Sequence, residues 1–147
     1  MNELLIKQYV KENFPNTHCV VSDGDYFFSY GSGNKFPFAT IVSKDNDFDN
    51  ASKLDRPSIF RLNIGISKET YASLFSAIDE QNGWDFAVLD EIIPHPVYGR
   101  IHWVCVNKPS VHTFKRVMPL LMEAFEMAVK KENRHPSVGN RALVEVD

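Results

Sequence analysis

Cysteine, positive charge and long apolar runs are all scarce in this chain. Its two cysteines, Cys19 and Cys105, lie far apart and form no CxxC or other metal-ligand spacing. The formal net charge of −3 argues against the basic surface expected of a nucleic-acid binder. No stretch approaches the roughly 20 apolar residues that span a bilayer, and the first residues lack the pattern of a signal peptide. We therefore expect a reduced, cytoplasmic protein with no membrane association, no cofactor and no bound metal.

The residues that are present suit one small domain. The chain has 147 residues, of which 44% are hydrophobic and 12% aromatic, so a core can form without a disulfide or a metal. No internal repeat and no Pro/Gly/Ser-rich linker divides it. We predict a single α+β domain over residues 1–133 and a loosely ordered C-terminal tail over residues 134–147.

Apolar periodicity predicts a helix first and then a series of strands. The first helix covers residues 2–13, with Leu5, Tyr9 and Val10 on its apolar face, and ends before Pro15. Strands are predicted over residues 18–22, 25–30, 36–43, 58–66 and 100–106. Further helices are predicted over residues 67–78, 85–92, 111–117 and 118–131, with Pro119 in the first turn of the last one.

Two signals in this series are specific. Asp23-Gly24 lies between two β-rich runs, which is a strong hairpin signal. Residues 58–66 alternate, with Leu62 on an apolar face and Arg61 on the opposite face, so we predict a strand with one buried face. The element order as a whole predicts an antiparallel sheet of about five strands with helices packed mainly on one face.

The polar segment over residues 44–57 is predicted to be a long exposed loop. It begins like a calcium loop at Asp45, but the sixth position is Asn50 instead of glycine and the twelfth is Arg56 instead of glutamate. We therefore interpret the segment as a solvated acidic loop and not as a calcium site.

Four strings carry a resemblance to a known family. They are Asp23-Gly24-Asp25 with the aromatic run after it, PFATIV at 37–42, FRLNIG at 60–65, and PHPVYGR at 94–100 followed by WVCV at 103–106. As a set, over roughly residues 4–131, they resemble an uncharacterised bacterial family of about this length. That family has no established activity, so the resemblance implies relatives but no chemistry.

More distantly, the layout is similar to the MmcQ/YjbR-like group of small α+β domains. That resemblance rests on the 60–62 strand and the strand with His102-Trp103, and it implies a YjbR-like antiparallel sheet with a wing-like hairpin. Some members of the group have been proposed to bind DNA. The hairpin of this chain carries Asp23 and Asp25, which disfavours contact with phosphates.

The densest polar constellation lies at residues 94–102. Histidine suits proton transfer near neutral pH, and arginine presents a planar fork for a carboxylate or a phosphate. We therefore predict a ligand-binding site formed by Arg61, His95, Tyr98, Arg100 and His102. The alternative is structural: Pro94, Pro96 and Gly99 shape a turn in which the charged groups pair with carboxylates. No Ser-His-Asp or Cys-His context assigns a catalytic residue.

Three functional hypotheses remain open from the sequence. The leading one is a small intracellular binding domain for a small anionic ligand or a protein partner. The second is a DNA-binding protein of the YjbR-like double-wing type. The third is an enzyme that uses His95 or His102 in acid–base chemistry. A hollow at the 94–102 segment would favour a site, whereas side chains that pair internally would favour the structural alternative.

Overall fold

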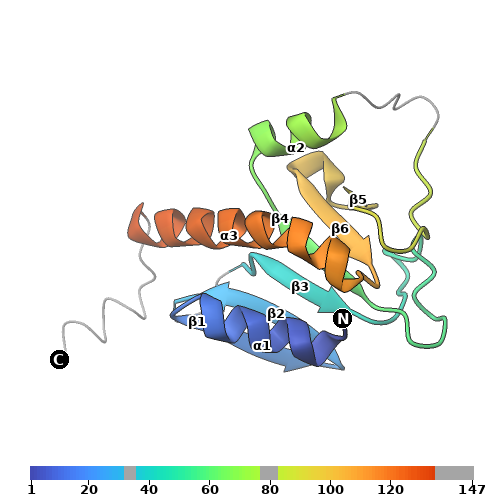
Figure 1. The fold of residues 1–147 in the computed structure, drawn as a ribbon, viewed down its shortest axis with the longest axis horizontal. Coiled ribbons are helices and arrows are strands. Elements are labelled where there is room, and N and C mark those ends of the chain that lie inside the picture. Colours follow the sequence, from blue (N-terminus) through green and yellow to red (C-terminus); the bar gives the residue numbers. More distant parts are fainter. Residues whose placement is uncertain (32–35, 77–82, 135–147) are drawn as a thin grey trace.

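A computed structural model describes residues 1–31, 36–76 and 83–134 of the chain. The elements are α1 (Glu3–Asn13), β1 (Thr17–Ser22), β2 (Asp25–Tyr30), β3 (Ala39–Val42), β4 (Arg61–Gly65), α2 (Lys68–Phe75), β5 (Ile93–Pro94), the 3₁₀ helix η2 (Gly99–Ile101), β6 (Trp103–Asn107) and α3 (Val111–Arg134). The strands form one antiparallel sheet in the order β1-β2-β3-β4-β6-β5 (Figure 1). The predicted α+β fold is confirmed, with a sixth, two-residue strand added at the edge.

The sheet starts with the predicted hairpin. Asp23 and Gly24 have φ values of 54° and 85°, and Ser22 pairs with Asp25 around them. Positive φ at both central residues is the mark of a type I′ turn, whose twist matches that of the two strands. Glycine at the second position adopts this conformation without a steric penalty.

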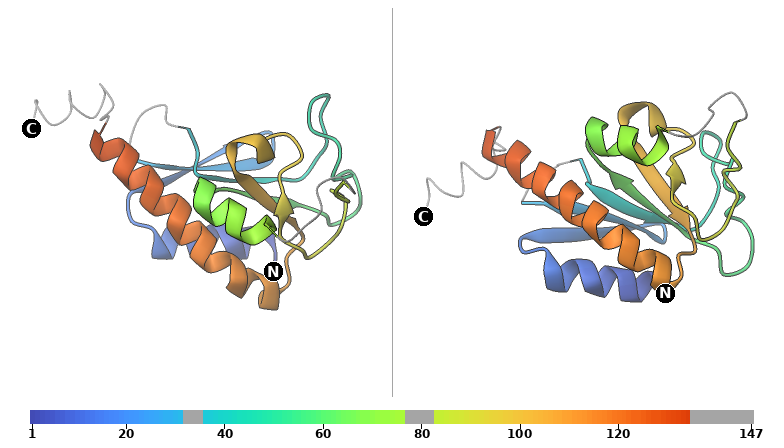
Figure 2. Two further views of the ribbon diagram at one scale, coloured as in Figure 1. Left: turned by 90° about the horizontal axis from the view of Figure 1, so that it is seen from above. Right: turned by 45° about the horizontal axis from the view of Figure 1, so that its top comes forward.

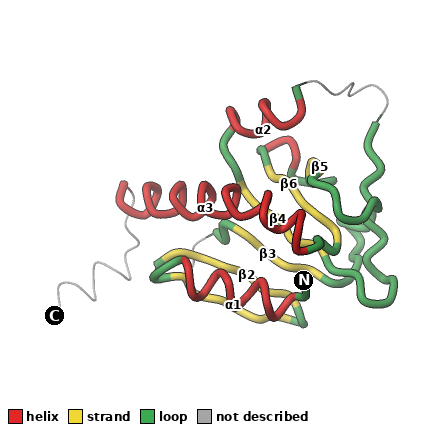
Figure 3. The backbone as a smooth tube through the Cα atoms, viewed as in Figure 1, coloured by secondary structure: helices red, strands yellow, loops and turns green. Residues whose placement is uncertain are grey.

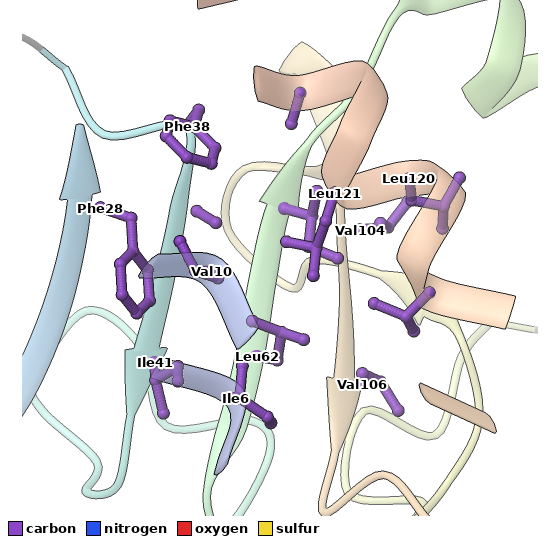
Figure 4. Packing of buried hydrophobic residues seen from close by; sticks show 14 of the residues in the cluster. Ile6, Val10, Phe28, Phe38, Ile41, Leu62, Val104, Val106, Leu120 and Leu121 are labelled. Carbon is purple, nitrogen blue, oxygen red and sulfur yellow. The ribbon is translucent and has the colours of Figure 1, made fainter. Parts of the chain in front are cut away.

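Helices α1, α2 and α3 lie on one face of the sheet, as predicted (Figure 2, left). Their apolar side chains and those of the strands form one continuous core. Figure 4 shows its centre, where α1 and α3 pack on the four middle strands. The labelled residues are Ile6, Val10, Phe28, Phe38, Ile41, Leu62, Val104, Val106, Leu120 and Leu121.

The apolar face of α1 was predicted wrongly by one residue. Ile6 and Val10 are fully buried, whereas Leu5 is 49% exposed. The helix begins with the sequence Leu4-Leu5-Ile6, so its apolar residues cover more than one stripe. Periodicity alone could not show which stripe contacts the sheet.

The predicted break at Pro119 is wrong, because α3 is one continuous helix. Pro119 lies on the exposed side of α3. Its missing N–H leaves the carbonyl of Lys115 without a helical partner, and water can satisfy a carbonyl on that side. The buried stripe on the opposite side includes Val117 and Leu121 and holds the helix together across the proline.

Residues 85–92 do not form the predicted helix. The side-chain amide of Asn107 donates to the carbonyls of Phe86 and Val88, both at 2.9 Å, and Leu89 forms a parallel bridge with Asn107. These contacts use carbonyls that a helix would bond internally. The segment is therefore held along the end of β6 in an irregular conformation.

Strand β6 begins at Trp103 and not, as predicted, at Arg100. Residues Gly99–Ile101 form the short helix η2, and His102 follows with φ 71°. A left-handed residue at this point turns the chain sharply into the strand.

The prediction that β4 has only one buried face is also wrong. Arg61 and Asn63 are as buried as Leu62 and Ile64. Two loops, residues 43–60 and 83–92, gather beside the sheet (Figure 3), and the first is not fully exposed, since Ser52 and Leu54 are buried. Helices therefore cover one face of β4, and loops cover the other.

Helix α2 starts as predicted, with the Ser67 side chain accepting from Thr70 N at 3.1 Å. Residues 77–82, at the predicted end of this helix, and residues 135–147, most of the predicted tail, lie outside the described residues. The domain boundary stays a prediction. Among the helices that the structure describes, none is long and apolar enough to cross a bilayer.

Leu62→Ala tests the core that positions the site. Leu62 is fully buried at the centre of the sheet, and its truncation should lower the free energy of unfolding by about 2–5 kcal/mol through lost transfer energy and the cavity left behind. Urea unfolding followed by circular dichroism measures it. The exposed Leu4 provides the control: Leu4→Ala should change stability by less than about 0.5 kcal/mol, and equal losses in the two variants would contradict this core.

Candidate functional site

The centre of the loop-covered face is the guanidinium of Arg61, which is completely buried. Arg61 is the first residue of β4, and its side chain extends along the face of the sheet opposite the helices. An arginine has five N–H groups and cannot lose its charge inside a protein. Burial therefore requires an acceptor for each N–H and a counter-charge.

Four of the five N–H groups of Arg61 donate to side-chain oxygens. Nε donates to Asn63 Oδ1 at 2.7 Å, and Nη1 donates to Asp49 Oδ1 at 2.9 Å and to Ser52 Oγ at 3.0 Å. Nη2 forms an ion pair with Asp49 Oδ2 and lies 3.1 Å from His95 Nε2. The Asp49 carboxylate therefore binds the guanidinium with both oxygens, the geometry that gives Arg–carboxylate pairs their strength.

A built turn places Asp49 over Arg61. The side-chain oxygen of Asn46 accepts from Phe48 N at 2.8 Å and from Asp49 N at 2.9 Å, and Asn46 N donates back to Asp49 O. Asparagine side chains commonly organise turns in this way. The turn directs Asp49 inward and leaves the preceding residue, Phe48, pointing outward.

His95 occupies the other side of the guanidinium and is also buried. Its Nδ1 accepts from the backbone N–H groups of Val97 and Tyr98, both at 3.0 Å, while Nε2 faces Arg61 and lies 3.8 Å from Asp49 Oδ2. Because Nδ1 accepts two hydrogen bonds, the neutral ring carries its proton on Nε2, the nitrogen that faces Arg61 and Asp49. A doubly protonated imidazolium would lose both hydrogen bonds to Nδ1, so this environment keeps the ring neutral.

The pKa values follow from this arrangement. Burial, with the Arg61 charge second, lowers the pKa of His95 to about 4. Burial alone would raise the pKa of Asp49, but the hydrogen bonds and charge of Arg61 outweigh it and hold that pKa below its ordinary value. At neutral pH the site therefore contains a carboxylate, a guanidinium and a neutral imidazole.

The cluster joins the two loops to the sheet. Asn63 donates to Thr40 on the neighbouring strand at 2.9 Å, which extends the network across β3. Arg56, in the 43–60 loop, donates to the carbonyls of Ser52 and Ala87 at 3.0 and 3.1 Å, which connects that loop to the 83–92 loop. We call Arg61, Asp49, His95, Asn63, Ser52 and Thr40 the Arg61 cluster.

The two thiols have different environments. Cys105 is buried beside the Arg61 cluster, and burial raises its pKa to about 12. Cys19 is only half-buried on β1. The described ranges contain no group of three or more His, Cys, Asp or Glu side chains that could hold a metal ion.

The five residues that the sequence grouped into a site do not all come together. The Tyr98 ring packs against His95 with ring centroids 5.0 Å apart and the ring planes inclined by 38°, so Arg61, His95 and Tyr98 are neighbours. Arg100 is exposed on η2, and no ion pair connects it to a carboxylate within the described residues. His102 ends η2 and packs against Tyr71 with ring centroids 5.5 Å apart.

Sequence reasoning missed the partner of Arg61. Asp49 was interpreted as part of a solvated loop, and Asn63 and Ser52 were not singled out. One signal was available: Arg61 and Asn63 alternate with apolar residues in a central strand, and their face had to be covered by something polar. An acidic segment directly precedes that strand in the sequence.

Asp49→Asn should destabilise the fold strongly. It removes the counter-charge of a buried guanidinium, a change that costs about 3 kcal/mol or more. Asp47→Asn, an exposed change of the same chemistry in the same turn, should alter the free energy of unfolding by less than about 0.5 kcal/mol. Urea unfolding at pH 7 compares the two, and similar losses would show that the Arg61–Asp49 pair is not a structural contact.

The low pKa of His95 predicts a pH-dependent stability with a defined sign. Between pH 6.5 and about 4 the unfolded chain binds a proton on this ring and the folded chain does not. The free energy of unfolding should therefore fall as the pH drops through that window, by about 3 kcal/mol in total. Below it, protonation of Asp49 removes further stability.

Urea unfolding across that window measures the slope. His95→Gln removes the titrating ring and should flatten it, whereas His18→Gln, at an exposed position, should not. A slope unchanged in His95→Gln would show that other groups cause the acid sensitivity.

Comparisons with known proteins place the chain in a family but supply no activity. No curated protein and no solved structure matches it, so the expected similarity to the YjbR-like group finds no support. One family model matches residues 1–137, which is most of the chain. It agrees with the resemblance carried by the four strings, and the chain belongs to DUF6194, a family of unknown function.

Proposed function

We propose that this protein is a binding domain that recognises a protein partner through the loop-covered side of its sheet. In this proposal the Arg61 cluster does not contact the partner. It anchors the loops, and side chains at the loop surface make the contact. The observation that carries the proposal is the position of Phe48.

Phe48 is 89% exposed, although it lies in an ordered turn. Its own N–H is bonded to the Asn46 side chain, and the next residue, Asp49, is paired with buried Arg61. An aromatic ring held in water by a rigid backbone loses little conformational entropy when it enters a partner's pocket. Rigid, exposed aromatic residues are typical anchors of protein interfaces.

A second exposed aromatic residue is attached to the same cluster. Tyr98 is 47% exposed, its backbone N–H donates to His95, and its ring packs against the imidazole at an inclined angle. Arg100 and Ile101 follow it on η2 and are also exposed. Two anchored aromatic side chains are therefore attached to the cluster around the buried ion pair, one from the 43–60 loop and one from the turn between β5 and η2.

The charges indicate the chemistry of the partner. Asp47 lies beside Phe48 on the exposed side of the turn, and the inward Asp49 is already neutralised by Arg61. A partner that combines an apolar or aromatic contact with a nearby Lys or Arg would suit Phe48 and Asp47 together.

Candidate catalytic groups are poorly suited to acid–base or nucleophilic work. His95 is buried with both ring nitrogens occupied, and its pKa of about 4 keeps it from accepting a proton near neutral pH. The buried Cys105 thiol, with a pKa of about 12, stays protonated. These features support a binding role over an enzymatic one.

An anionic ligand at Arg61 would have to displace Asp49. Four of the five N–H groups of Arg61 already donate to internal oxygens, and the competing carboxylate belongs to the same chain. Of the three arginine and histidine side chains other than Arg61 that were expected to bind an anion, Arg100 is the exposed one, and it has no carboxylate partner in the described residues. The protein-partner hypothesis therefore has the better support.

A library of random 12-residue peptides displayed on phage provides a defined probe. Selection on the immobilised protein should enrich peptides that combine aromatic or aliphatic residues with Arg or Lys. Fluorescence anisotropy then measures their affinity for variants. Phe48→Ser should weaken binding at least about tenfold, as expected for an interface anchor, and Tyr98→Ser should weaken it less.

The matched control is Val111→Ser, an exposed apolar residue on α3, which should bind like the unchanged protein. Failure to enrich any peptide, or enriched peptides that bind Phe48→Ser equally well, would overturn the proposal. It would also be overturned if inorganic phosphate alone raised the melting temperature and an Arg100→Ala/His102→Ala double variant lost that effect, because an anionic ligand would then be the better assignment.

A further inference from the structure

Strand β1 forms one edge of the sheet, and its outer side has free backbone groups. It pairs only with β2 among the described residues. Gly31 N donates to Asn16 O at 2.9 Å, and the two-residue turn is closed by Ser22 and Asp25. In an antiparallel pair every second residue of a strand forms hydrogen bonds to the neighbouring strand through its N–H and C=O. The residues between them direct both backbone groups away from that neighbour. Thr17, Cys19 and Val21 therefore direct their N–H and C=O groups outward.

This edge lacks the features that keep sheet edges from pairing. Thr17–Ser22 contains no lysine, no proline and no acidic residue. Its pairing with β2 is continuous, so no β-bulge twists it away. Val20 and Val21 are 58% and 54% exposed. Edge strands of monomeric proteins are usually protected by charge, proline or a bulge.

We propose that β1 pairs antiparallel with β1 of a second copy of this chain, so that two six-stranded sheets form one continuous sheet across a two-fold axis. Such an interface is self-complementary, because the same three residues supply the bonds on both sides.

One register uses all of the outward groups. When Cys19 lies opposite Cys19 of the second copy, Thr17 lies opposite Val21 and Val21 opposite Thr17. Each of these three pairs can exchange two backbone hydrogen bonds. A shift of one step in one direction places Pro15, which has no N–H, opposite Val21, and a shift in the other places Asp23 of the turn opposite Thr17. The Cys19-centred register is therefore favoured.

The charged groups near this edge set the conditions for a test. Lys7 and Lys11 of α1 lie close enough to act on the Cys19 thiol. In the paired arrangement the lysines of both copies approach the axis and repel each other, and added salt screens that repulsion. Association should therefore be measured at high ionic strength.

Sedimentation equilibrium over a range of concentrations tests the pairing. At high concentration the apparent mass of the wild-type protein should approach twice the 16.8 kDa mass of one chain. Val21→Pro removes an outward N–H and should weaken association at least about tenfold while leaving the melting temperature nearly unchanged, since proline is tolerated at a strand edge. Val20→Pro is the matched control: its N–H bonds to β2, so it should lower the melting temperature instead.

The register has its own test. In the paired strands the two Cys19 Cα atoms would lie about 5.5 Å apart, so a short bis-maleimide should crosslink the unchanged protein and Cys105→Ser but not Cys19→Ser. A protein that stays monomeric at about 1 mM, several orders of magnitude above typical specific affinities, would overturn the proposal. So would equally tight association of Val21→Pro, or crosslinking of Cys19→Ser at the same yield.

Discussion

The requirement that a buried guanidinium be fully bonded governs the loop-covered half of this molecule. Arg61 has no exposed surface, keeps its charge, and needs five acceptors. No helix covers it, so the acceptors come from a neighbouring strand residue, Asn63, and from loop residues such as Asp49 and Ser52. Irregular segments that would otherwise lie loosely on the sheet are thereby held in one conformation. A buried ion pair adds little net stability compared with an apolar replacement, but removal of one partner is costly because it leaves an uncompensated buried charge.

The same interaction makes Arg61 and His95 unavailable to a ligand. In the sequence Arg61 and His95 look like ligand-binding groups, because exposed arginine and histidine commonly bind anions. In the structure they bind each other and Asp49, and burial beside the guanidinium keeps the imidazole neutral. What the cluster leaves to solvent are the side chains that it anchors, Phe48 and Tyr98. The buried charges thus fix the backbone that holds the exposed rings in place.

The two edges of the sheet differ in the same physical terms. At the β5 end, the 83–92 segment is bonded to Asn107, so backbone groups near that edge have partners. At the β1 end, Thr17, Cys19 and Val21 direct theirs outward and the valines are exposed. Unpaired strand groups and exposed apolar area favour association. Contact with other molecules is thus favoured at β1 through the backbone and at the loops through side chains.

The sequence by itself determined the features that depend on neighbouring residues. These are the hairpin at Asp23-Gly24, the helix start at Ser67, the presence of a strand within residues 58–66 and the α+β order of elements, because turn chemistry, capping and periodicity act over a few positions. Only the tertiary structure decided the rest. The partner of Arg61 lies 12 residues away in a loop, the carbonyls of residues 85–92 are taken by Asn107, and the helix continues through Pro119 because its opposite side is buried. Such outcomes depend on contacts between segments that are distant in the sequence. A local sequence pattern does not specify which distant groups will come into contact.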